Sequence, residues 1–480
     1  MSAWQAQLWR YLSASVRNTN WGRAGLLVAV AFLSALGGAM VTEYRIFPYP
    51  VLRQAWSGLF YVLDSVDGGE PYQDFLFQPA REDTGGVVAR NEAAMQPGLT
   101  ALTWFHDDVL YLVDARGREV HRYEPKFSPA DRRTFRRIFG EVHGLMDRLD
   151  RVHLGRARVL PGGEALLMVY GAGRHWEQPL GLIRVDRDSN ILWRHYDASL
   201  HHDFDIAPDG RIAVLAREVR TSQQKGLEYL PTPYMDDLVV ILSPSGEVLQ
   251  RLSLFEALRD SGFSLRGMRD GILGLGHEDY QGDFLHANNV DFITPEQARN
   301  FPHGEAGDLL ISLRNPHAIG VLNRERRAFT WLTRGPWIAQ HDPDILANGN
   351  ILLFDNLGGW EPAGRSRILE VDPESLGITW RYEGTPEQPF QSVIRGSQQR
   401  LANGNTLITE SSAGRVFEVD PAGRIVWDLR SPFRTGPQGG LVPGVHWAVR
   451  LDEREFTPEF REFLKERTPA PLAQPAEERG

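Results

Sequence analysis

The chain has 480 residues, of which 42% are hydrophobic and 24% charged, so it can bury a large core and is neither disordered nor fibrous. A formal net charge of −10 provides no overall positive field for phosphate backbones, and this balance argues against nucleic acid as a partner. The sequence contains no cysteine, which excludes disulfides, thiolate nucleophiles and iron–sulfur clusters.

An uncharged run at residues 24–42 is the first predicted element. At about 1.5 Å per residue, a helix over this run covers roughly the 30 Å hydrocarbon core of a bilayer. Arg10, Arg17 and Arg23 precede it without an acidic residue, which predicts a cytoplasmic segment at residues 1–23. We therefore predict a single-pass anchor in the plasma (inner) membrane, with the remaining chain on the periplasmic or extracytoplasmic side. A cleaved signal peptide is the alternative.

A linker is expected at residues 43–95, before the chain enters its main domain. Within it, the run from Pro50 to Ser65 has apolar residues at helical spacing and a proline at its start. We expect this run to form a helix along the membrane or against the domain.

Two hairpin phrases recur between residues 96 and 452. Six copies of the first pair two β-type runs around a polar turn: LVDARGREVHRYE, RVDRDSNILWRHY, ILSPSGEVLQRLS, VLNRERRAFTWLT, EVDPESLGITWRY and EVDPAGRIVWDLR. The second phrase precedes four of them, as RVLPGGEALLM, DIAPDGRIAVLA, DILANGNILLF and RLANGNTLIT. Two hairpins make a four-stranded antiparallel sheet, so six radial units predict an all-β fold, a six-bladed β-propeller over residues 96–452.

Helical periodicity interrupts the repeats in two places, residues 131–150 and 253–262, which we interpret as insertions on loops. At the C-terminus, residues 453–480, a short helix is expected from about Pro458, followed by a disordered tail rich in Pro, Ala and Glu.

Three histidines occupy the same register in successive units. The corresponding positions just before the hairpin turn are Ala207, Asp291 and Leu346, and counting back five residues from them gives His202, His286 and His341. The equivalents in two other units are Gly155 and Gly396. This strand precedes the first hairpin turn, so it is the innermost strand and lines the central channel. We expect the three imidazoles to converge on one funnel.

A histidine at the start of a strand is more often a capping or packing residue, and His201, one position away from His202, would point to the other strand face. Several capping or packing residues are expected within a group of five other histidines: His153, His195, His303, His317 and His446. The shared register of the other three favours a functional site, because clustered titratable groups in a cleft are suited to chemistry.

Four phrases, HHDFDIAPDG, LHANNVDFI, GDLLISLRNPHAIGVLNRERRAFTWL and QHDPDILANGNILLFDN, resemble the arylsulfotransferase family in their order. These bacterial sulfotransferases do not use the nucleotide sulfate donor. The likeness covers about residues 201–428, and its most distinctive element is the Ser-x-Arg of SLR, which ends at Arg314.

The resemblance implies a six-bladed propeller that passes a sulfuryl group from an aryl sulfate ester to a phenolic acceptor through a sulfohistidine. His341 of QHD would be the nucleophile, while His202, His286 and Arg314 would bind and polarise the sulfuryl oxygens. No cofactor or metal is implied. The better-known periplasmic members have an added N-terminal β-domain and a disulfide, whereas this chain has a predicted anchor and no cysteine, so acceptor choice and oligomeric state do not carry over.

Two other functions are compatible with these residues. His202, His286 and His341 could hold zinc with an open fourth position, as in a metal-dependent hydrolase or lactonase. Alternatively, the propeller could be a tethered, non-catalytic module that binds proteins or glycans through its loops.

Overall fold

The computed structural model describes residues 25–26, 28–34, 36, 38, 76–81, 84–143, 149–173, 177–228, 230, 232–263, 282–359, 365–436 and 439–472. The chain divides into two units, Met1–Pro71 and Tyr72–Gly480. The described residues of the first unit are helical and exposed. Across the described ranges, no helix has both the length and the apolarity needed to cross a membrane. Much of the predicted anchor, all of residues 1–23 and the predicted helix from Pro50 lie outside the described residues.

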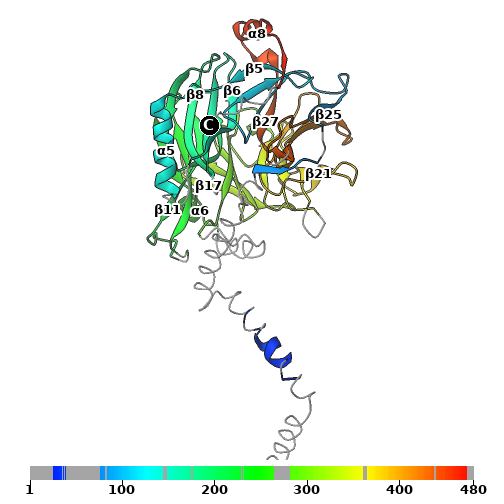
Figure 1. Cartoon of the computed structure of the whole chain (residues 1–480). Coiled ribbons are helices and arrows are strands. Elements are labelled where there is room, and N and C mark those ends of the chain that lie inside the picture. The colour runs from blue at the N-terminus through cyan, green and yellow to red at the C-terminus, as the bar shows by residue number, and fades with distance from the viewer. Residues whose placement is uncertain are drawn as a thin grey trace, which may run out of the picture. The chain divides into compact units, whose positions relative to one another are not determined.

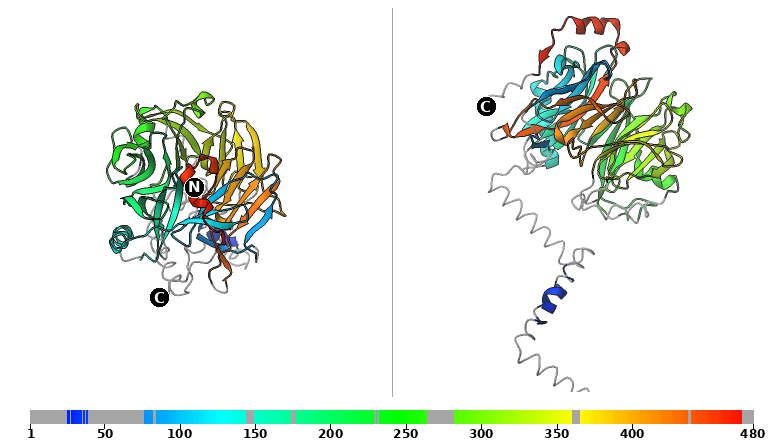
Figure 2. Two further views of the ribbon diagram at one scale, coloured as in Figure 1. Left: turned by 90° about the horizontal axis from the view of Figure 1, so that it is seen from above. Right: turned by 90° about the vertical axis from the view of Figure 1, so that its right-hand side faces the viewer.

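Six sheets of the second unit form the blades of a propeller, which confirms the predicted architecture. Four blades are built from consecutive strands. They are β6 (Arg151–Val159), β7 (Ala165–Ala172), β8 (Glu177–Val185) and β9 (Ile191–His195); β10 (Leu200–Ile206), β11 (Ile212–Arg220), β12 (Tyr234–Leu242) and β13 (Val248–Ser253); β14 (Ala287–Phe292), β15 (Leu309–Leu313), β16 (Ala318–Asn323) and β17 (Ala328–Arg334); and β18 (His341–Ile345), β19 (Ile351–Asp355), β20 (Arg367–Val371) and β21 (Ile378–Glu383). Viewed end-on, the blades follow one another around an axis (Figure 2).

The other two blades join the two ends of the propeller chain. One contains β2 (Gly86–Arg90), β22 (Ser397–Arg400), β23 (Thr406–Glu410), β24 (Arg415–Val419) and β25 (Ile425–Arg430). The other contains β27 (Val445–Leu451), β3 (Leu99–Trp104), β4 (Leu110–Val113), β5 (Arg118–Tyr123) and β28 (Ala470–Pro471). A small sheet pairs β1 (Phe77–Pro79) with β26 (Leu441–Pro443). The ring is therefore closed twice, by β2 on β25 and by β27 on β3.

The repeated phrases correspond to the blade hairpins, and the glycines of their turns have left-handed φ values, such as 83° at Gly210 and 86° at Gly349. Hydrophobic clusters lie between blades. Met168 and Leu182 of one blade, for example, pack with Phe204 and Val240 of the next. Each blade thus buries both faces against its neighbours, which explains the strand runs that are buried throughout, such as those of β7 and β15.

The tryptophan that ends several of the first phrases connects neighbouring blades. The indole Nε1 donates to a backbone carbonyl in the outer turn of the next blade in three cases: Trp193 to Pro244 at 3.1 Å, Trp380 to Pro421 at 2.9 Å and Trp427 to Ala115 at 2.9 Å. These bonds give each indole N–H a partner and link neighbouring blades.

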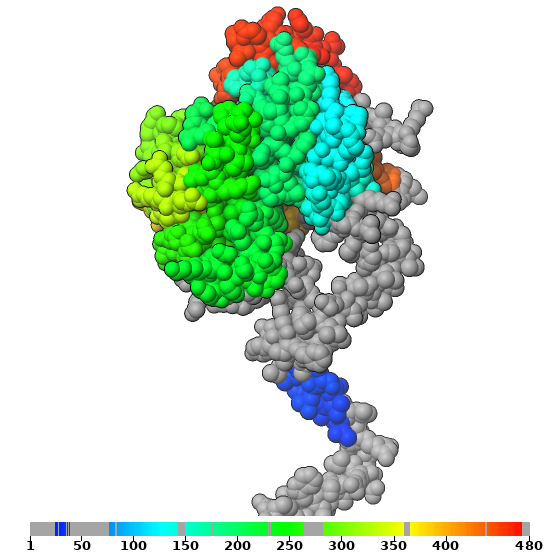
Figure 3. Space-filling view, turned by 90° about the vertical axis from the view of Figure 1, so that its left-hand side faces the viewer, coloured from blue at the N-terminus to red at the C-terminus, as the bar shows by residue number. Residues whose placement is uncertain are grey.

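Helix α5 lies at the outer edge of the ring, and α8 lies at one end of the propeller (Figure 1). The described helices of the second unit are α5 (Pro129–His143), α6 (Leu254–Asp260), α8 (Pro458–Lys465) and the short 3₁₀ helices η1 (Gln297–Arg299), η2 (Ser411–Ala413) and η4 (Glu453–Glu455). The first two occupy the predicted insertions. Helix α8 is capped by Thr457 and packs Phe460 against Gly163, at the far end of β6 (Figure 3). After α8 the chain adds β28 to β5, so pairing continues beyond the helix.

Candidate functional site

The three predicted histidines lie at the start of the inner strands of consecutive blades. His202 lies in β10, His286 directly precedes β14, and His341 begins β18. Beside each of them the ladder to the second strand shifts register. The φ angles of His202 and His286 are also left-handed, at 55° and 48°. Bulges of this kind redirect side chains, so local irregularity, rather than strict alternation, sets where the imidazoles point.

These three histidines and Arg314 form one cluster. The rings of His202 and His286 meet edge to face with their centroids 4.9 Å apart. Burial holds the pKa of His202 well below its ordinary value, and the nearby His286 and His341 add to the effect. Burial, followed by the guanidinium of Arg314, lowers the pKa of His341 to about 3. The residues that the sequence placed in one funnel are therefore within interaction distance of one another.

Arg314 lies in the turn between β15 and β16, and backbone bonds tie this turn to the start of β14. The Arg314 N–H donates to the His286 carbonyl at 3.1 Å, and the Asn315 N–H donates to the Leu285 carbonyl at 3.2 Å. The Arg314 side chain donates through Nη1 to Asn315 Oδ1 at 2.9 Å, and the residue is only 6% exposed. A cation is thus fixed beside His341 in a poorly solvated place.

His341 is held in one tautomer. Its Nδ1 lies 2.7 Å from Asn356 Oδ1 and 3.1 Å from the Ala339 carbonyl, and both oxygens only accept, so the ring proton is on Nδ1. The amide orientation of Asn356 is settled because its Nδ2 donates to the carbonyls of Ser392 and Arg395, at 2.7 and 2.6 Å. The lone pair of His341 is consequently on Nε2, to which no described residue donates a hydrogen bond.

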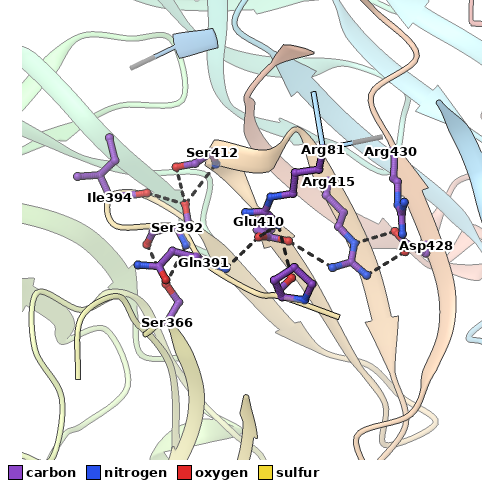
Figure 4. A network of polar contacts seen from close by, with 11 residues as sticks. Arg81, Ser366, Gln391, Ser392, Ile394, Glu410, Ser412, Arg415, Asp428 and Arg430 are labelled. Atoms are coloured by element: carbon purple, nitrogen blue, oxygen red, sulfur yellow. Dashed lines mark hydrogen bonds and ion pairs between the residues drawn. The ribbon is translucent and has the colours of Figure 1, made fainter. Parts of the chain in front are cut away.

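The carbonyls of Ser392 and Arg395 that bind the Asn356 amide belong to the loop ahead of β22. This loop is itself anchored by hydrogen bonds (Figure 4). The Ser392 N–H donates to Ser366 Oγ at 2.8 Å, and the Gln391 N–H donates to Glu410 Oε1 at 2.9 Å. The fully buried Glu410 is paired with Arg81 at 2.7 Å and Arg415 at 3.3 Å. The orientation of His341 therefore depends on an ion-pair network in the next blade.

Carboxylates orient the other two imidazoles. Asp283 Oδ2 lies 2.6 Å from His286 Nδ1. Burial alone would raise the pKa of Asp283, but His286 outweighs it and the pKa is held below the ordinary value, so the carboxylate is ionised. His202 Nδ1 lies 2.8 Å from His201 Nδ1, and His201 Nε2 lies 3.3 Å from Asp237 Oδ1. The bulge in β10 thus makes His201 a contact of His202, although strand alternation predicted that it would point away.

Further along the inner strands the channel is acidic. Arg156 of β6 bridges Asp203 and Asp342, at 3.0 and 2.8 Å. Burial and the other carboxylates raise the pKa of Asp291 and Asp344 well above the ordinary value. Arg156 thus lies among several carboxyl groups of the inner strands.

A second cluster joins the inner strands β6 and β27 with β8, and the sequence analysis missed it. His153 of β6 lies 2.8 Å from Glu177 at the start of β8, and His446 of β27 is 3.9 Å from the same oxygen. Gly155, the register equivalent of His202, leaves room for Tyr170, because a Cβ there would be 2.4 Å from that ring. The available signal was the strand position of His153 and His446, which belong to the group expected to include several packing residues.

The zinc alternative for His202, His286 and His341 stays a prediction. Among the described residues, the group whose ligand atoms all lie within 4.8 Å of one another is His153, Glu177 and His446, not the three predicted histidines. Nδ1 of each of the three predicted histidines faces a neighbouring side chain, namely His201, Asp283 and Asn356 in turn.

Comparison with known proteins gives one family. The profile of the arylsulfotransferase (ASST) family matches residues 176–432. No curated protein matches the chain.

Similar solved structures share little sequence with the chain. A protein of unknown function from Bacteroides caccae is 13% identical, with 70% of this chain and 94% of that one covered and a TM-score of 0.42. Virginiamycin B lyase from Staphylococcus aureus, an inactive variant with quinupristin, is 10% identical, with 74% and 88% covered and a TM-score of 0.35. The Cps50 (Swd1) propeller domain from Myceliophteria thermophila is 10% identical, with 74% and 89% covered and a TM-score of 0.37.

Proposed function

Because the chain belongs to the arylsulfotransferase family, we propose that it moves a sulfuryl group from an aryl sulfate ester to a phenolic acceptor through a sulfohistidine at His341. The observation that carries this assignment is the state of His341: its proton is on Nδ1, its pKa is lowered to about 3 by burial and Arg314, and its Nε2 lone pair accepts no hydrogen bond from a described residue. A neutral imidazole of this kind is a nucleophile across the physiological pH range.

In the first half-reaction, His341 Nε2 forms a bond to sulfur while the bond from sulfur to the aryl oxygen breaks. Arg314 neutralises negative charge on the sulfuryl oxygens, and because its guanidinium is already fixed, little reorganisation is needed. The Asn356 carbonyl oxygen, 2.7 Å from Nδ1, stabilises the positive charge that sulfation places on the ring.

In this proposal His286 donates the proton needed in the first half-reaction and accepts the proton released in the second. Asp283 Oδ2, 2.6 Å from Nδ1, orients the ring, and we assign to His286 the role of general acid that gives its Nε2 proton to the departing phenolate. In the second half-reaction the neutral ring takes the proton of the acceptor phenol as its oxygen attacks sulfur and the bond between nitrogen and sulfur breaks. His202, whose ring meets that of His286 edge to face, would contact the sulfuryl oxygens.

The test is a pre-steady-state assay with a chromogenic aryl sulfate. Donor alone should release one phenol per site in a burst, followed by slow hydrolysis, and an added phenol should accelerate turnover with ping-pong kinetics. Mass spectrometry after quenching should find a sulfuryl adduct on the peptide containing His341. The His341→Ala variant should fold and show no burst. Transfer at the normal rate by that variant, or turnover that depends on a metal and not on an acceptor, would contradict the proposal.

Arg314 has its own prediction. The Arg314→Ala variant removes one charge-stabilising group and should slow the burst by about one to three orders of magnitude. The amplitude should stay at one phenol per site, because the nucleophile is intact. An unchanged burst rate in a folded variant would show that Arg314 only pairs with neighbouring protein groups.

We further propose that residues 24–42 anchor the protein in the plasma membrane, with the propeller on the extracytoplasmic side. The uncharged run and the arginines before it support this placement. The full-length protein should sediment with membranes, resist salt and carbonate, and be released by detergent. Protease added to spheroplasts should reach the propeller. Release by salt alone would contradict the anchor.

A further inference from the structure

The second cluster, His153, Glu177 and His446, has the composition and spacing of a metal site. One ligand atom from each residue lies within 4.8 Å of the other two. His153 Nε2 is 2.8 Å, and His446 Nε2 is 3.9 Å, from Glu177 Oε1. Two imidazole nitrogens and one carboxylate oxygen are a common donor set for zinc and other divalent transition metals.

Unpartnered nitrogens provide an independent observation. Nε2 of His446 and Nδ1 of His153 are buried, and neither makes a hydrogen bond with any described residue. The two side chains are 8% and 0% exposed. A buried polar atom without a partner destabilises the folded state, because it has lost its hydrogen bond to water. An ion bonded to His446 Nε2 would remove this cost at the nitrogen that faces Glu177.

The surroundings orient the ligands. Arg395 pairs with Glu177 Oε2, which leaves Oε1 as the oxygen that faces both histidines. Aromatic rings enclose the cluster, with Phe105 and Tyr170 centroids 5.0 and 5.1 Å from that of His446. Hydrogen bonding to a ligating carboxylate and an apolar surround are typical of the outer shell of metal sites.

We propose that His153, Glu177 and His446 bind one divalent transition-metal ion of the zinc class. The ligands come from β27, the strand that closes the ring, and from the next blade through β6 and β8. The ion would therefore link β27 to the neighbouring blade, which contains β6 and β8. We call His202, His286, His341 and Arg314 the sulfuryl-transfer cluster. None of the proposed metal ligands belongs to it, so the site stands independently of the proposed activity.

The experiment measures zinc itself and not turnover. The full-length protein is treated with a chelator, saturated with zinc chloride, desalted and assayed for bound zinc, and affinity is measured by calorimetry. We expect one zinc ion per chain. Because loss of an outer-shell partner alone costs 10–100-fold in affinity, His446→Gln should weaken binding by at least about 100-fold. His202→Gln, a histidine change on another inner strand, should retain the ion.

Thermal unfolding provides a second measurement. Zinc that binds only the folded state should raise the Tm of the wild type and of His202→Gln, but not that of His446→Gln. If His446→Gln does not fold, His153→Gln replaces it. Substoichiometric zinc on the wild type, an unchanged wild-type Tm, or zinc that is retained by His446→Gln and lost from His202→Gln would each overturn the proposal. The last result would place the ion at the sulfuryl-transfer cluster instead.

Discussion

At the scale of single residues, the site depends on small differences between chemically identical side chains. Three imidazoles lie in one cluster, but His341 faces an amide oxygen while His286 faces a carboxylate. The Asn356 oxygen fixes the tautomer of His341. In the proposed mechanism this neutral ring attacks sulfur and His286 moves the protons.

The low pKa of His341 predicts a flat pH dependence. Its folded-state value of about 3, caused first by burial and then by Arg314, keeps the ring neutral well below pH 6. The burst rate should therefore not fall between pH 7.5 and 5.5, whereas a ring with the ordinary pKa of about 6.5 would lose about tenfold of its neutral form. Quenched-flow measurement of phenol release over this range checks it. A fall centred near pH 6.5 would contradict the assignment.

The lowered pKa of His341 also changes the free energy of unfolding with pH, so the assay must be run where the protein is folded. The unfolded chain takes up a proton at this histidine near pH 6.5, whereas the folded chain stays neutral down to about 3. Because the unfolded state binds more protons in this window, the contribution of His341 to stability decreases as the pH drops below about 6.5. Near-UV circular dichroism should confirm folded protein at each pH.

The Arg314→Gln variant removes the guanidinium that lowers the pKa of His341. Its burst rate should therefore begin to fall at a higher pH than that of the wild type.

At the scale of the elements, the inner strands do more than present alternating side chains. Register shifts in β10, β14 and β18 place their histidines together. In β6 the equivalent position is Gly155, which lets Tyr170 occupy the space beside His446. One register position therefore serves the sulfuryl-transfer cluster in three blades and makes room for an aromatic ring in a fourth.

Gly155→Ala tests this close packing. A Cβ would lie 2.4 Å from the Tyr170 ring and 3.0 Å from His446 Nε2, and both groups are buried. Forcing an extra methyl group into such a place typically costs about 1–3 kcal/mol. We expect a lower denaturation midpoint, measured by tryptophan fluorescence in urea. Gly162→Ala is the matched control, because no atom lies within 4 Å of its added Cβ. Equal midpoints for the two variants would contradict the packing argument.

At the scale of the whole molecule, the ring is closed by strands from opposite ends of the propeller chain. Strand β3 pairs with the C-terminal β27, and the N-terminal β2 pairs with β25. These contacts bring together residues more than 300 positions apart, as the bond from Trp427 to Ala115 shows. Closure removes exposed sheet edges that would otherwise favour aggregation.

The propeller should fold without the first unit. Deletion of residues 1–71 keeps every described strand, since β1 begins at Phe77. We expect a soluble protein with the circular dichroism, Tm and burst of the full chain in detergent. Deletion of residues 445–480 is the contrasting variant. It removes β27, leaves β3 without its inner neighbour and should give no soluble protein. Aggregation of the first variant would contradict the boundary at residue 71.

Most of the sulfuryl-transfer cluster could be predicted from sequence, because a propeller repeats the same strand position in every blade. His202, His286 and His341 were identified by register, and Arg314 by a family motif. Their partners could not be predicted this way. Asn356 and Asp283 act through side-chain geometry, and each is an ordinary loop residue in the sequence.

The sequence by itself determined the number of blades, the hairpins and the inner strands, because these follow from local patterns: turn residues, β-type runs and a repeated register. Only the tertiary structure decided which strands close the ring, why His201 contacts His202, and that His153, Glu177 and His446 meet. Those outcomes depend on contacts between residues far apart in the chain and on bulges, where one shifted residue redirects a side chain. Neither leaves a periodic trace in the sequence.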